Sequence, residues 1–224
     1  MRNLFILLLG TILLLACSPE TSEENATPLG DWRHHGGNHR SEKYSPLDQV
    51  NGSNFGLLEV AWRYRSPDLE LPEELAYPTG DYRAMPLVIN GVMYVNSNHG
   101  LISALDPVTG EEHWVFDPKS YEYGPPLFSP LQTRGIEYWT DGNIERLFIA
   151  TSGKQLVSVD IETGQPDPNF GDDGYVDLRE NFGRFEFEMN NITHGAPPIA
   201  VGSTVVVGSK IYDYPMYHRS PPGH

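Results

Sequence analysis

Short apolar runs alternate with turn residues along most of the chain, and this pattern predicts β-strands rather than helices. The runs at 92–97 and 146–151 are rich in β-branched and aromatic residues and lie between stretches that contain glycine, asparagine, aspartate or serine. Apolar residues spaced three and four positions apart, as in an amphipathic helix, are nearly absent. The 22 glycines and 19 prolines supply many chain reversals. We therefore predict an all-β fold of short strands.

The predicted strands recur with a period of 54 residues. Two strands keep one register across two copies, at 92–97 and 101–106 in the first copy and at 146–151 and 155–160 in the second. A third copy begins at Pro197, where PPIAVGSTVVVGS echoes PLVINGVMYVNS from Pro86 onward. A repeat of about 50 residues made of short strands is typical of the blades of a β-propeller.

Each of the first two copies contains the turn motif Asp-x-x-Thr-Gly, at 106–110 and 160–164. The aspartate is suited to cap the turn through its side chain, and the glycine supplies a positive φ. Trp114 follows the first motif, and we expect it to pack between neighbouring blades. The second motif is followed by Gln-Pro-Asp-Pro, which predicts a longer excursion over roughly 165–195. Residues 67–84 form another insertion, and insertions of this length are usually functional.

The first residues have the pattern of an export signal. An apolar stretch at 5–15 follows Arg2, is interrupted only by Gly10 and Thr11, and is too short to span a bilayer. It ends in Leu-Leu-Ala-Cys at Cys17, the only cysteine, which looks like a bacterial lipobox. We predict a signal peptide at 1–16 and lipid on Cys17. The alternative is an ordinary signal peptide followed by a chance cysteine.

The anchor implies a location and a linker. Residues 17–30 are polar and acidic, and we interpret them as a lipidated tether. The protein is then expected on the bacterial cell envelope, facing the periplasm, and Ser18 after the cysteine favours the outer membrane. A lipidated Cys17 leaves no thiol for a disulfide, and no Cys-x-x-Cys-His motif is present for a c-type haem. The formal charge of −15 argues against nucleic acid or anionic lipid as the main partner.

Three stretches carry a resemblance to a known family. The sequence ALDPVTGEEHW is similar to the repeat of PQQ-type propellers. Residues 32–65, with YSPL and a later Ala-Trp, resemble the N-terminal segment of quinoprotein dehydrogenases, and RGIEYW at 134–139 resembles their "RG-x-x-YW" segment. The chain from 31 to 224 thus resembles the N-terminal part of a bacterial PQQ-dependent alcohol or glucose dehydrogenase.

The resemblance implies a fold and a reaction. The complete protein would be an eight-bladed propeller with PQQ on its axis and Ca²⁺ beside it. It would be an oxidoreductase in which the carbinol of an alcohol or sugar gives its proton to an aspartate and a hydride to PQQ. A respiratory acceptor would then take the electrons. Residues 31–224 would hold only the first three or so blades and stop within a blade. We therefore expect an incomplete propeller, inactive alone, whose catalytic base lies beyond residue 224.

The resemblance also suggests site residues. Arg134 is the expected PQQ contact, because the planar guanidinium fork suits carboxylate and carbonyl oxygens. Thr193, Gly195 and Ser209 lie near other PQQ-contacting positions of the family, and Asp213 falls on the position of an acidic Ca²⁺ ligand. The competing interpretations are a surface arginine that ties down a loop and a turn aspartate. His194 is expected to be a loop histidine with satisfied hydrogen bonds.

The sequence departs from the family in places. Arg83 stands where relatives often have a glutamate, which puts the shape of the PQQ pocket in doubt. The stretch at 129–133 lacks the cysteine pair of some relatives, and Pro130 replaces a histidine of the glucose enzymes. These losses weaken a glucose-specific assignment more than the PQQ assignment.

Two non-enzymatic functions remain as alternatives. A propeller lipoprotein of the outer-membrane barrel-assembly machinery has the same kind of repeat and anchor, and would bind peptide edges by strand addition. RGIEYW and YSPL argue against such a scaffold, which has no use for an arginine on the axis. A sugar- or polymer-binding propeller is the other alternative, and no specific motif supports it.

Overall fold

The structure contains the strands that the repeat predicts, together with others. The computed structural model describes residues 30–80, 82–124, 133–180, 194 and 196–209. The predicted signal peptide and nearly all of the predicted tether lie outside these ranges. The described part holds strands β1 to β10 and three short 3₁₀ helices. Within it, no helix is long and apolar enough to cross a membrane.

The first copy of the repeat forms a four-stranded antiparallel sheet in chain order. Its strands are β1 (Leu87–Ile89), β2 (Val92–Asn96), β3 (Ile102–Leu105) and β4 (Glu112–Phe116). The other edge of β1 is occupied at one point by Trp32, whose N–H donates to Val88 O at 2.7 Å and whose carbonyl accepts from Val88 N at 3.0 Å. The segment at 30–40, called the N-terminal segment below, is therefore paired with the free edge of β1 at this point.

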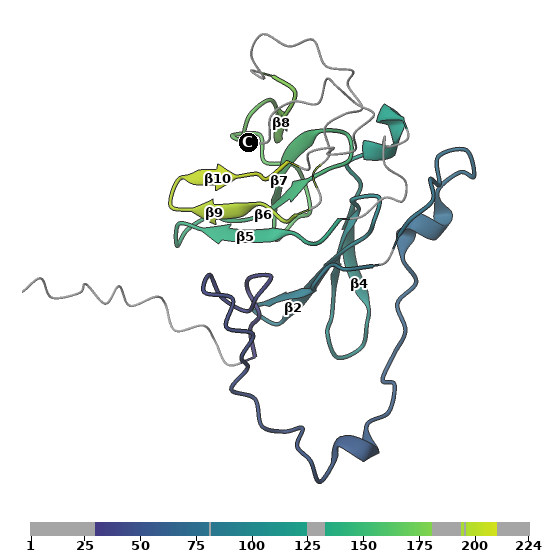
Figure 1. Ribbon diagram of the computed structural model, residues 1–224, viewed down its shortest axis with the longest axis vertical. Helices are drawn as coiled ribbons and strands as arrows, with labels where there is room; N and C mark the ends of the chain where they lie inside the picture. The colour runs from purple at the N-terminus through teal and green to yellow at the C-terminus, as the bar shows by residue number, and fades with distance from the viewer. Residues whose placement is uncertain (1–29, 81, 125–132, 181–193, 195, 210–224) are drawn as a thin grey trace, which may run out of the picture.

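The second copy forms an equivalent sheet, and the third copy begins one more. The second sheet contains β5 (Glu137–Thr140), β6 (Glu145–Ala150), β7 (Gln155–Asp160) and β8 (Tyr175–Asp177), again antiparallel in chain order. Strands β9 (Ile199–Val201) and β10 (Thr204–Val206) form a hairpin, and Figure 1 shows it beside β5. Two four-stranded sheets and a hairpin at the predicted repeats confirm a partial, unclosed propeller.

The stretch expected to be an excursion contains a strand. β8 lies within 165–195 and pairs with the first half of β7, from Gln155↔Asp177 to Val157↔Tyr175. Proline has no N–H to donate, and Pro166 meets β7 only at an isolated bridge with Val159. The chain then turns at 167–174 before it can pair again, which is why the fourth strand comes late.

The two sheets share one apolar core. Its buried side chains come from both sheets and from the segments that join them: Leu87, Ile89, Tyr94, Ile102, Ala104, Phe116, Ile136, Tyr138, Leu147, Ile149, Val157, Val159 and Ile161. Most are β-branched or aromatic. In β1 and β2 they alternate with half-buried positions, whereas β3, β6 and β7 are buried at successive positions, so both faces of these strands are covered.

A tryptophan from the preceding segment covers the glycine of each Asp-x-x-Thr-Gly turn. Gly110 has a φ of +74°, and a Cβ there would lie 2.6 Å from the indole of Trp62. Gly164 has a φ of +69°, and a Cβ there would lie 2.6 Å from the indole of Trp114. The predicted packing of Trp114 between blades is confirmed, and we call these two contacts the tryptophan–glycine locks.

The aspartates cap these turns as predicted. Asp106 Oδ1 accepts hydrogen bonds from the N–H groups of Val108 at 2.8 Å and Thr109 at 2.7 Å. Asp160 Oδ1 accepts from Thr163 N at 2.8 Å and from its hydroxyl at 2.7 Å. Each turn therefore satisfies its backbone donors locally.

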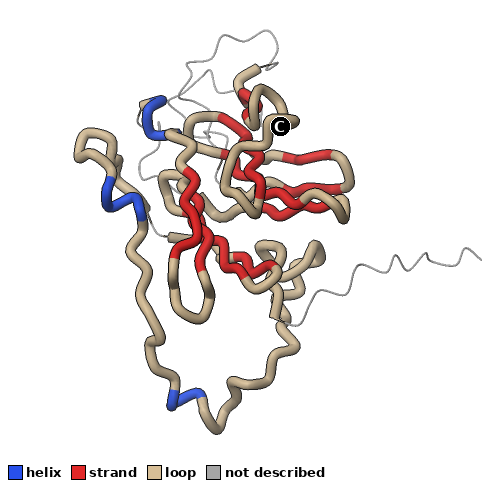
Figure 2. Tube along the Cα trace, turned by 180° about the vertical axis from the view of Figure 1, so that it is seen from behind, coloured by secondary structure: helices blue, strands red, loops and turns tan. Residues whose placement is uncertain are grey.

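A long segment leaves the sheets and returns to them. It carries the 3₁₀ helices η1 (Phe55–Leu57) and η2 (Pro67–Glu70), and Figure 2 shows it as an extended loop that arcs away from the strands. The segment is fastened to the first sheet near its end. There Trp62 Nε1 donates to Pro107 O at 3.1 Å, and Tyr64 hydrogen-bonds Ser103 Oγ at 2.9 Å. The third 3₁₀ helix, η3 (Ser120–Tyr123), follows β4.

Candidate functional site

One end of the two sheets gathers polar side chains from several segments. The end of β2 meets the segment before β5 there, because the Thr133 hydroxyl donates to Ser97 O at 2.7 Å and accepts from Asn96 Nδ2 at 2.8 Å. We call this region, formed by 96–101, 133–135 and 151–154, the candidate end. Arg134 lies in it, directly after the buried Thr133.

Two other segments approach the backbone beside Arg134. The neighbouring Gly135 has a φ of +152°, and a Cβ there would lie 3.5 Å from His35 Nδ1 and 3.7 Å from Pro197 Cβ. The N-terminal segment and the start of the third copy therefore meet at this point. The Arg134 side chain itself is exposed. His35 Nδ1 is buried, and within the described part of the chain it has no hydrogen-bond partner.

His194 is buried at the start of the third copy. Its Nδ1 lies 3.1 Å from Gly208 O, and a carbonyl oxygen only accepts, so Nδ1 carries the proton. Burial lowers the pKa of His194, so the ring is neutral and Nε2 holds a lone pair. This Nε2 is buried, and no described atom hydrogen-bonds it. We expected a loop histidine with both ring nitrogens hydrogen-bonded, and among the described residues only Nδ1 has a partner.

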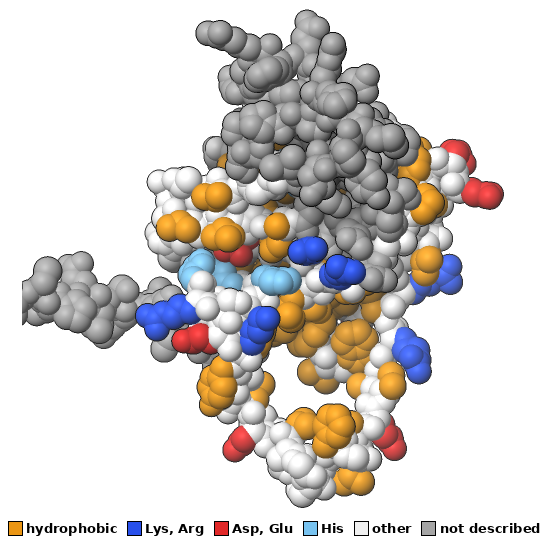
Figure 3. Space-filling view, viewed as in Figure 1, with side chains coloured by type: hydrophobic (Ala, Val, Ile, Leu, Met, Phe, Trp, Pro, Cys, Tyr) orange, Lys and Arg blue, Asp and Glu red, His pale blue; other side chains and the backbone are white. Residues whose placement is uncertain are grey.

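Lys154 adds a cation to the same region. It lies in the β6–β7 turn, 5% exposed, and its Nζ donates to Ser152 O at 2.9 Å. Burial, and then the charge of Arg179, lower the pKa of Lys154. The Lys154 charge also lowers the pKa of His194. In Figure 3, histidine, lysine and arginine side chains form a band across the middle of one face.

The other residues predicted from the resemblance are only partly in view. Ser209 is half-buried and follows Gly208, whose carbonyl faces His194. Arg83 is exposed, shortly before β1. Thr193, Gly195, Asp213 and Cys17 lie outside the described residues. The PQQ and Ca²⁺ roles of all these residues therefore stay predictions.

A histidine–aspartate pair also lies at the candidate end, and it is not among the site residues that the sequence predicts. His99, in the β2–β3 turn, is 3% exposed, and its Nδ1 lies 2.9 Å from Asp68 Oδ2. Both His99 Nε2 and Asp68 Oδ1 are buried, and in the described part of the chain neither has a hydrogen-bond partner. Asp68 belongs to the insertion at 67–84, and the length of this insertion is the only feature of the sequence that indicates a functional role there.

The pair lines a cavity of about 740 Å³. The wall is mostly aromatic and apolar, and it includes Trp62, Tyr64, Leu69, Tyr77 and Tyr82. A carboxylate that orients an imidazole, with the second ring nitrogen unpaired, is an arrangement that can exchange a proton with a bound group. A largely apolar cavity with one polar pair also has the character of a small-molecule site.

Comparison with known proteins agrees with this architecture. Residues 32–224 match the family model described as "Glucose/ethanol/alcohol dehydrogenase, beta-propeller domain". The chain is 30% identical over 216 residues to quinoprotein glucose dehydrogenase A of Acinetobacter calcoaceticus, covering 87% of this chain and 26% of that protein. It is 33% identical over 146 residues to the dehydrogenase subunit of the quinone alcohol dehydrogenase of Gluconobacter oxydans, covering 65% of this chain and 17% of that protein.

The similarity extends to solved structures. Quinohemoprotein alcohol dehydrogenase from Comamonas testosteroni superposes with a TM-score of 0.62 at 23% identity, over 84% of this chain and 24% of that one. This likeness shows the fold. The chain spans about a quarter of the length of the curated glucose dehydrogenases that it matches. With a family model that covers nearly all of the described fold, the chain belongs to the PQQ-dependent glucose/ethanol/alcohol dehydrogenase β-propeller family.

Proposed function

We propose that this chain is part of a quinoprotein dehydrogenase that oxidises an alcohol or a sugar with PQQ and Ca²⁺. The observation that carries the proposal is the placement of Arg134 three residues before β5, at the candidate end that also holds Lys154. Lys154 is a buried cation there, in a chain whose formal charge is −15. Relatives named as glucose and alcohol dehydrogenases support oxidation at a CH–OH group.

The residues present fit an anionic quinone. PQQ carries three carboxylates, and a buried site for it needs cations and N–H donors. Arg134 offers a planar fork, and buried Lys154 offers a point charge. Ser209 would add a hydroxyl, and Thr193 and Gly195 would lie close by. When bound, PQQ would supply the acceptor for a hydride from the substrate carbinol.

Asp213 is the proposed protein ligand of Ca²⁺, which prefers oxygen donors. We expect the ion to act as a Lewis acid at this site. The electrons would pass to a respiratory acceptor. The base that takes the substrate proton is not assigned to a residue of this chain.

The test of the cofactor site is Arg134→Lys in the protein produced from its own gene. Lysine keeps the charge and loses the fork, so PQQ binding should weaken by about ten- to a hundredfold, or roughly 1.5–3 kcal/mol. The measurement is dye reduction with an alcohol or sugar during PQQ titration. Arg40→Lys, at an exposed arginine of the N-terminal segment, is the matched control and should titrate like the unaltered protein.

Asp213→Ala should behave differently from Arg134→Lys. It should raise the Ca²⁺ concentration needed for activity and leave the stability of the apoprotein little changed. An Arg134→Lys protein with unchanged PQQ titration would remove Arg134 from the site. A protein that binds no PQQ would instead favour the scaffold function, with Arg83 as the first residue to examine.

We also propose that lipid on Cys17 anchors the protein to the cell envelope at the outer membrane, facing the periplasm. The Leu-Leu-Ala-Cys motif after an apolar stretch supports this, and several acyl chains hold a protein on a membrane far better than one. Cys17→Ser should shift the protein from the membrane to the soluble periplasmic fraction. Membrane retention of this variant, together with processing unaffected by a globomycin-type inhibitor, would contradict the anchor.

A further inference from the structure

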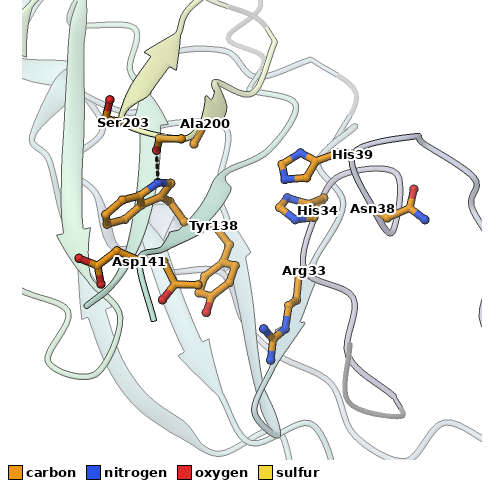
Figure 4. Close-up of a pocket in the computed structure, with 11 residues that line it drawn as sticks. Arg33, His34, Asn38, His39, Tyr138, Asp141, Ala200 and Ser203 are labelled. Atoms are coloured by element: carbon orange, nitrogen blue, oxygen red, sulfur yellow. Dashed lines mark hydrogen bonds between the residues drawn. The ribbon is translucent and has the colours of Figure 1, made fainter. Parts of the chain in front are cut away.

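Two histidines and a glutamate converge between the N-terminal segment and the second sheet. His34 and His39 lie on the N-terminal segment, and Glu137 is the first residue of β5. One possible ligand atom from each residue lies within 4.8 Å of the other two. Figure 4 shows the rings of His34 and His39 side by side, and their centroids are 3.9 Å apart.

The contact between His34 and Glu137 is close, yet it leaves the ring nitrogen without a hydrogen bond. His34 Nδ1 lies 3.3 Å from Glu137 Oε1. The nitrogen is buried, and among the described residues it has no partner of hydrogen-bond geometry. Two ligand atoms about 2.0–2.1 Å from a tetrahedral metal stand roughly 3.3 Å apart. The spacing of these two atoms is therefore that of neighbouring ligands.

The surroundings hold the Glu137 carboxylate in place and leave the His39 side chain free to rotate. Glu137 is 4% exposed, and its Oε1 accepts from Ala200 N at 3.3 Å. His39 is exposed, so rotation of its side chain can close the remaining gap without moving the backbone. A hydrogen bond from a neighbouring strand to a ligating carboxylate is a usual feature of metal sites.

We propose that His34, His39 and Glu137 bind a first-row divalent transition metal, with Zn²⁺ as the best match. Two imidazoles and one carboxylate form a ligand set that such ions favour over Ca²⁺. The ion fastens the N-terminal segment to β5, next to the contact of Ala200 with Glu137. The proposal depends neither on PQQ nor on the proposed role of Asp213.

An adjoining cavity of about 730 Å³ gives solvent and the ion a path to the ligands. Arg33 lines it, and its charge is met by Asp31, with Nε 2.9 Å from Oδ2. Asp141 lines it as well, and its carboxylate accepts from the N–H groups of Asn143 and Ile144, both at 2.9 Å. The fourth coordination position then belongs to a water molecule from the cavity.

The test is metal binding by the 224-residue chain after removal of metals with a chelator. Zn²⁺ titration by calorimetry, and Co²⁺ titration by visible absorption, should each give one site per chain, with a tetrahedral Co²⁺ spectrum. Excess Ca²⁺ should not displace either ion. His39→Ala removes an exposed ligand and should keep the fold, and it should weaken binding by more than about 100-fold, beyond the loss typical for an outer-shell residue.

Two further variants complete the experiment. Glu137→Gln should weaken binding like His39→Ala, and circular dichroism checks its fold. His113→Gln is the matched control, because His113 is an exposed histidine of β4 outside the cluster, and it should bind as the unaltered chain does. Absence of a stoichiometric site, or full binding by the folded His39→Ala chain, would overturn the proposal.

Discussion

At the scale of single residues, several buried polar atoms have no hydrogen-bond partner among the described residues. His99 and Asp68 use one polar atom each in their mutual contact and leave the other unpaired among the described residues. A buried polar atom without a partner costs free energy. The pair is therefore maintained at a cost, which is the usual sign of a group kept for binding or chemistry.

Removal of Asp68 should destabilise the protein measurably. In Asp68→Ala the buried His99 loses its partner, and the free energy of unfolding should fall by about 1–3 kcal/mol. Glu73→Ala removes an exposed carboxylate from the same insertion, and its effect should stay within about 0.5 kcal/mol. Urea unfolding followed by circular dichroism measures both, and equal effects of the two variants would show that the pair has no stabilising role.

The turn aspartates should make the fold sensitive to acid. Hydrogen bonds from the backbone of Thr109 and Val108 lower the pKa of Asp106 below its usual range, and those from Ile144 and Asn143 lower the pKa of Asp141. Each depressed pKa favours the folded state while the carboxylate is ionised. This contribution is complete above the unfolded pKa of about 3.9 and is lost as the pH falls through the folded pKa.

The Asp106→Asn/Asp141→Asn double variant isolates this effect. The amide oxygen still accepts hydrogen bonds but does not titrate, so the free energy of unfolding should fall less steeply below about pH 4 than in the unaltered chain. Denaturant unfolding at a series of pH values measures the slope. Parallel curves for the two proteins would contradict the assignment of acid sensitivity to these turns.

At the scale of elements, the tryptophan–glycine locks join each segment to the next sheet. Gly164 has a positive φ, and the Trp114 indole fills the space that a Cβ would need. Gly91 also has a positive φ, of +81°, but no atom lies within 4 Å of where its Cβ would be. The left-handed conformation costs an L-residue about 1–2 kcal/mol, and this strain is common to both positions. An alanine at position 164 would also clash with the Trp114 indole, whereas an alanine at position 91 would clash with nothing.

Alanine at these two glycines should therefore separate strain from contact. Gly164→Ala should lower the free energy of unfolding by about 1–3 kcal/mol more than Gly91→Ala does, which is the usual cost of overpacking. Gly110→Ala, at the other lock, should behave like Gly164→Ala. Equal losses at Gly91 and Gly164 in thermal or urea unfolding would mean that the indole contact contributes nothing.

At the scale of the whole molecule, the hairpin of the third copy has one strand edge that no described residue pairs with. In the described residues β10 pairs only with β9. Side chains along this hairpin are well exposed, with Ile199 at 52%, Val201 at 63% and Val206 at 55%. An open, apolar edge strand is a template for pairing with another chain.

The 224-residue chain should accordingly self-associate as its concentration rises. Val206→Lys places a charge on the open strand and should shift the distribution toward monomer. Val108→Lys, at a turn residue of the first sheet that is 78% exposed, is the matched control and should leave association unchanged. Sedimentation velocity over a range of concentrations measures this, and a monomer at every concentration would refute it.

How much of this molecule the sequence predicts depends on how local each feature is. The strands, the turns and the Trp114 lock follow from a repeat in which neighbouring residues determine each element. Strand β8 was missed because Pro166 interrupts the pairing that the first copy would predict. The His99–Asp68 pair and the cluster of His34 and Glu137 join distant segments that carry no periodic signal, so only the folded chain brings them together.

The locks also impose an order in time. Each tryptophan precedes the glycine that it covers by about 50 residues, from Trp62 to Gly110 and from Trp114 to Gly164. Until that later turn has folded, the indole of the earlier segment is uncovered and available to chaperones. In the two described sheets, each lock therefore closes only after the turn about 50 residues further along the chain has formed.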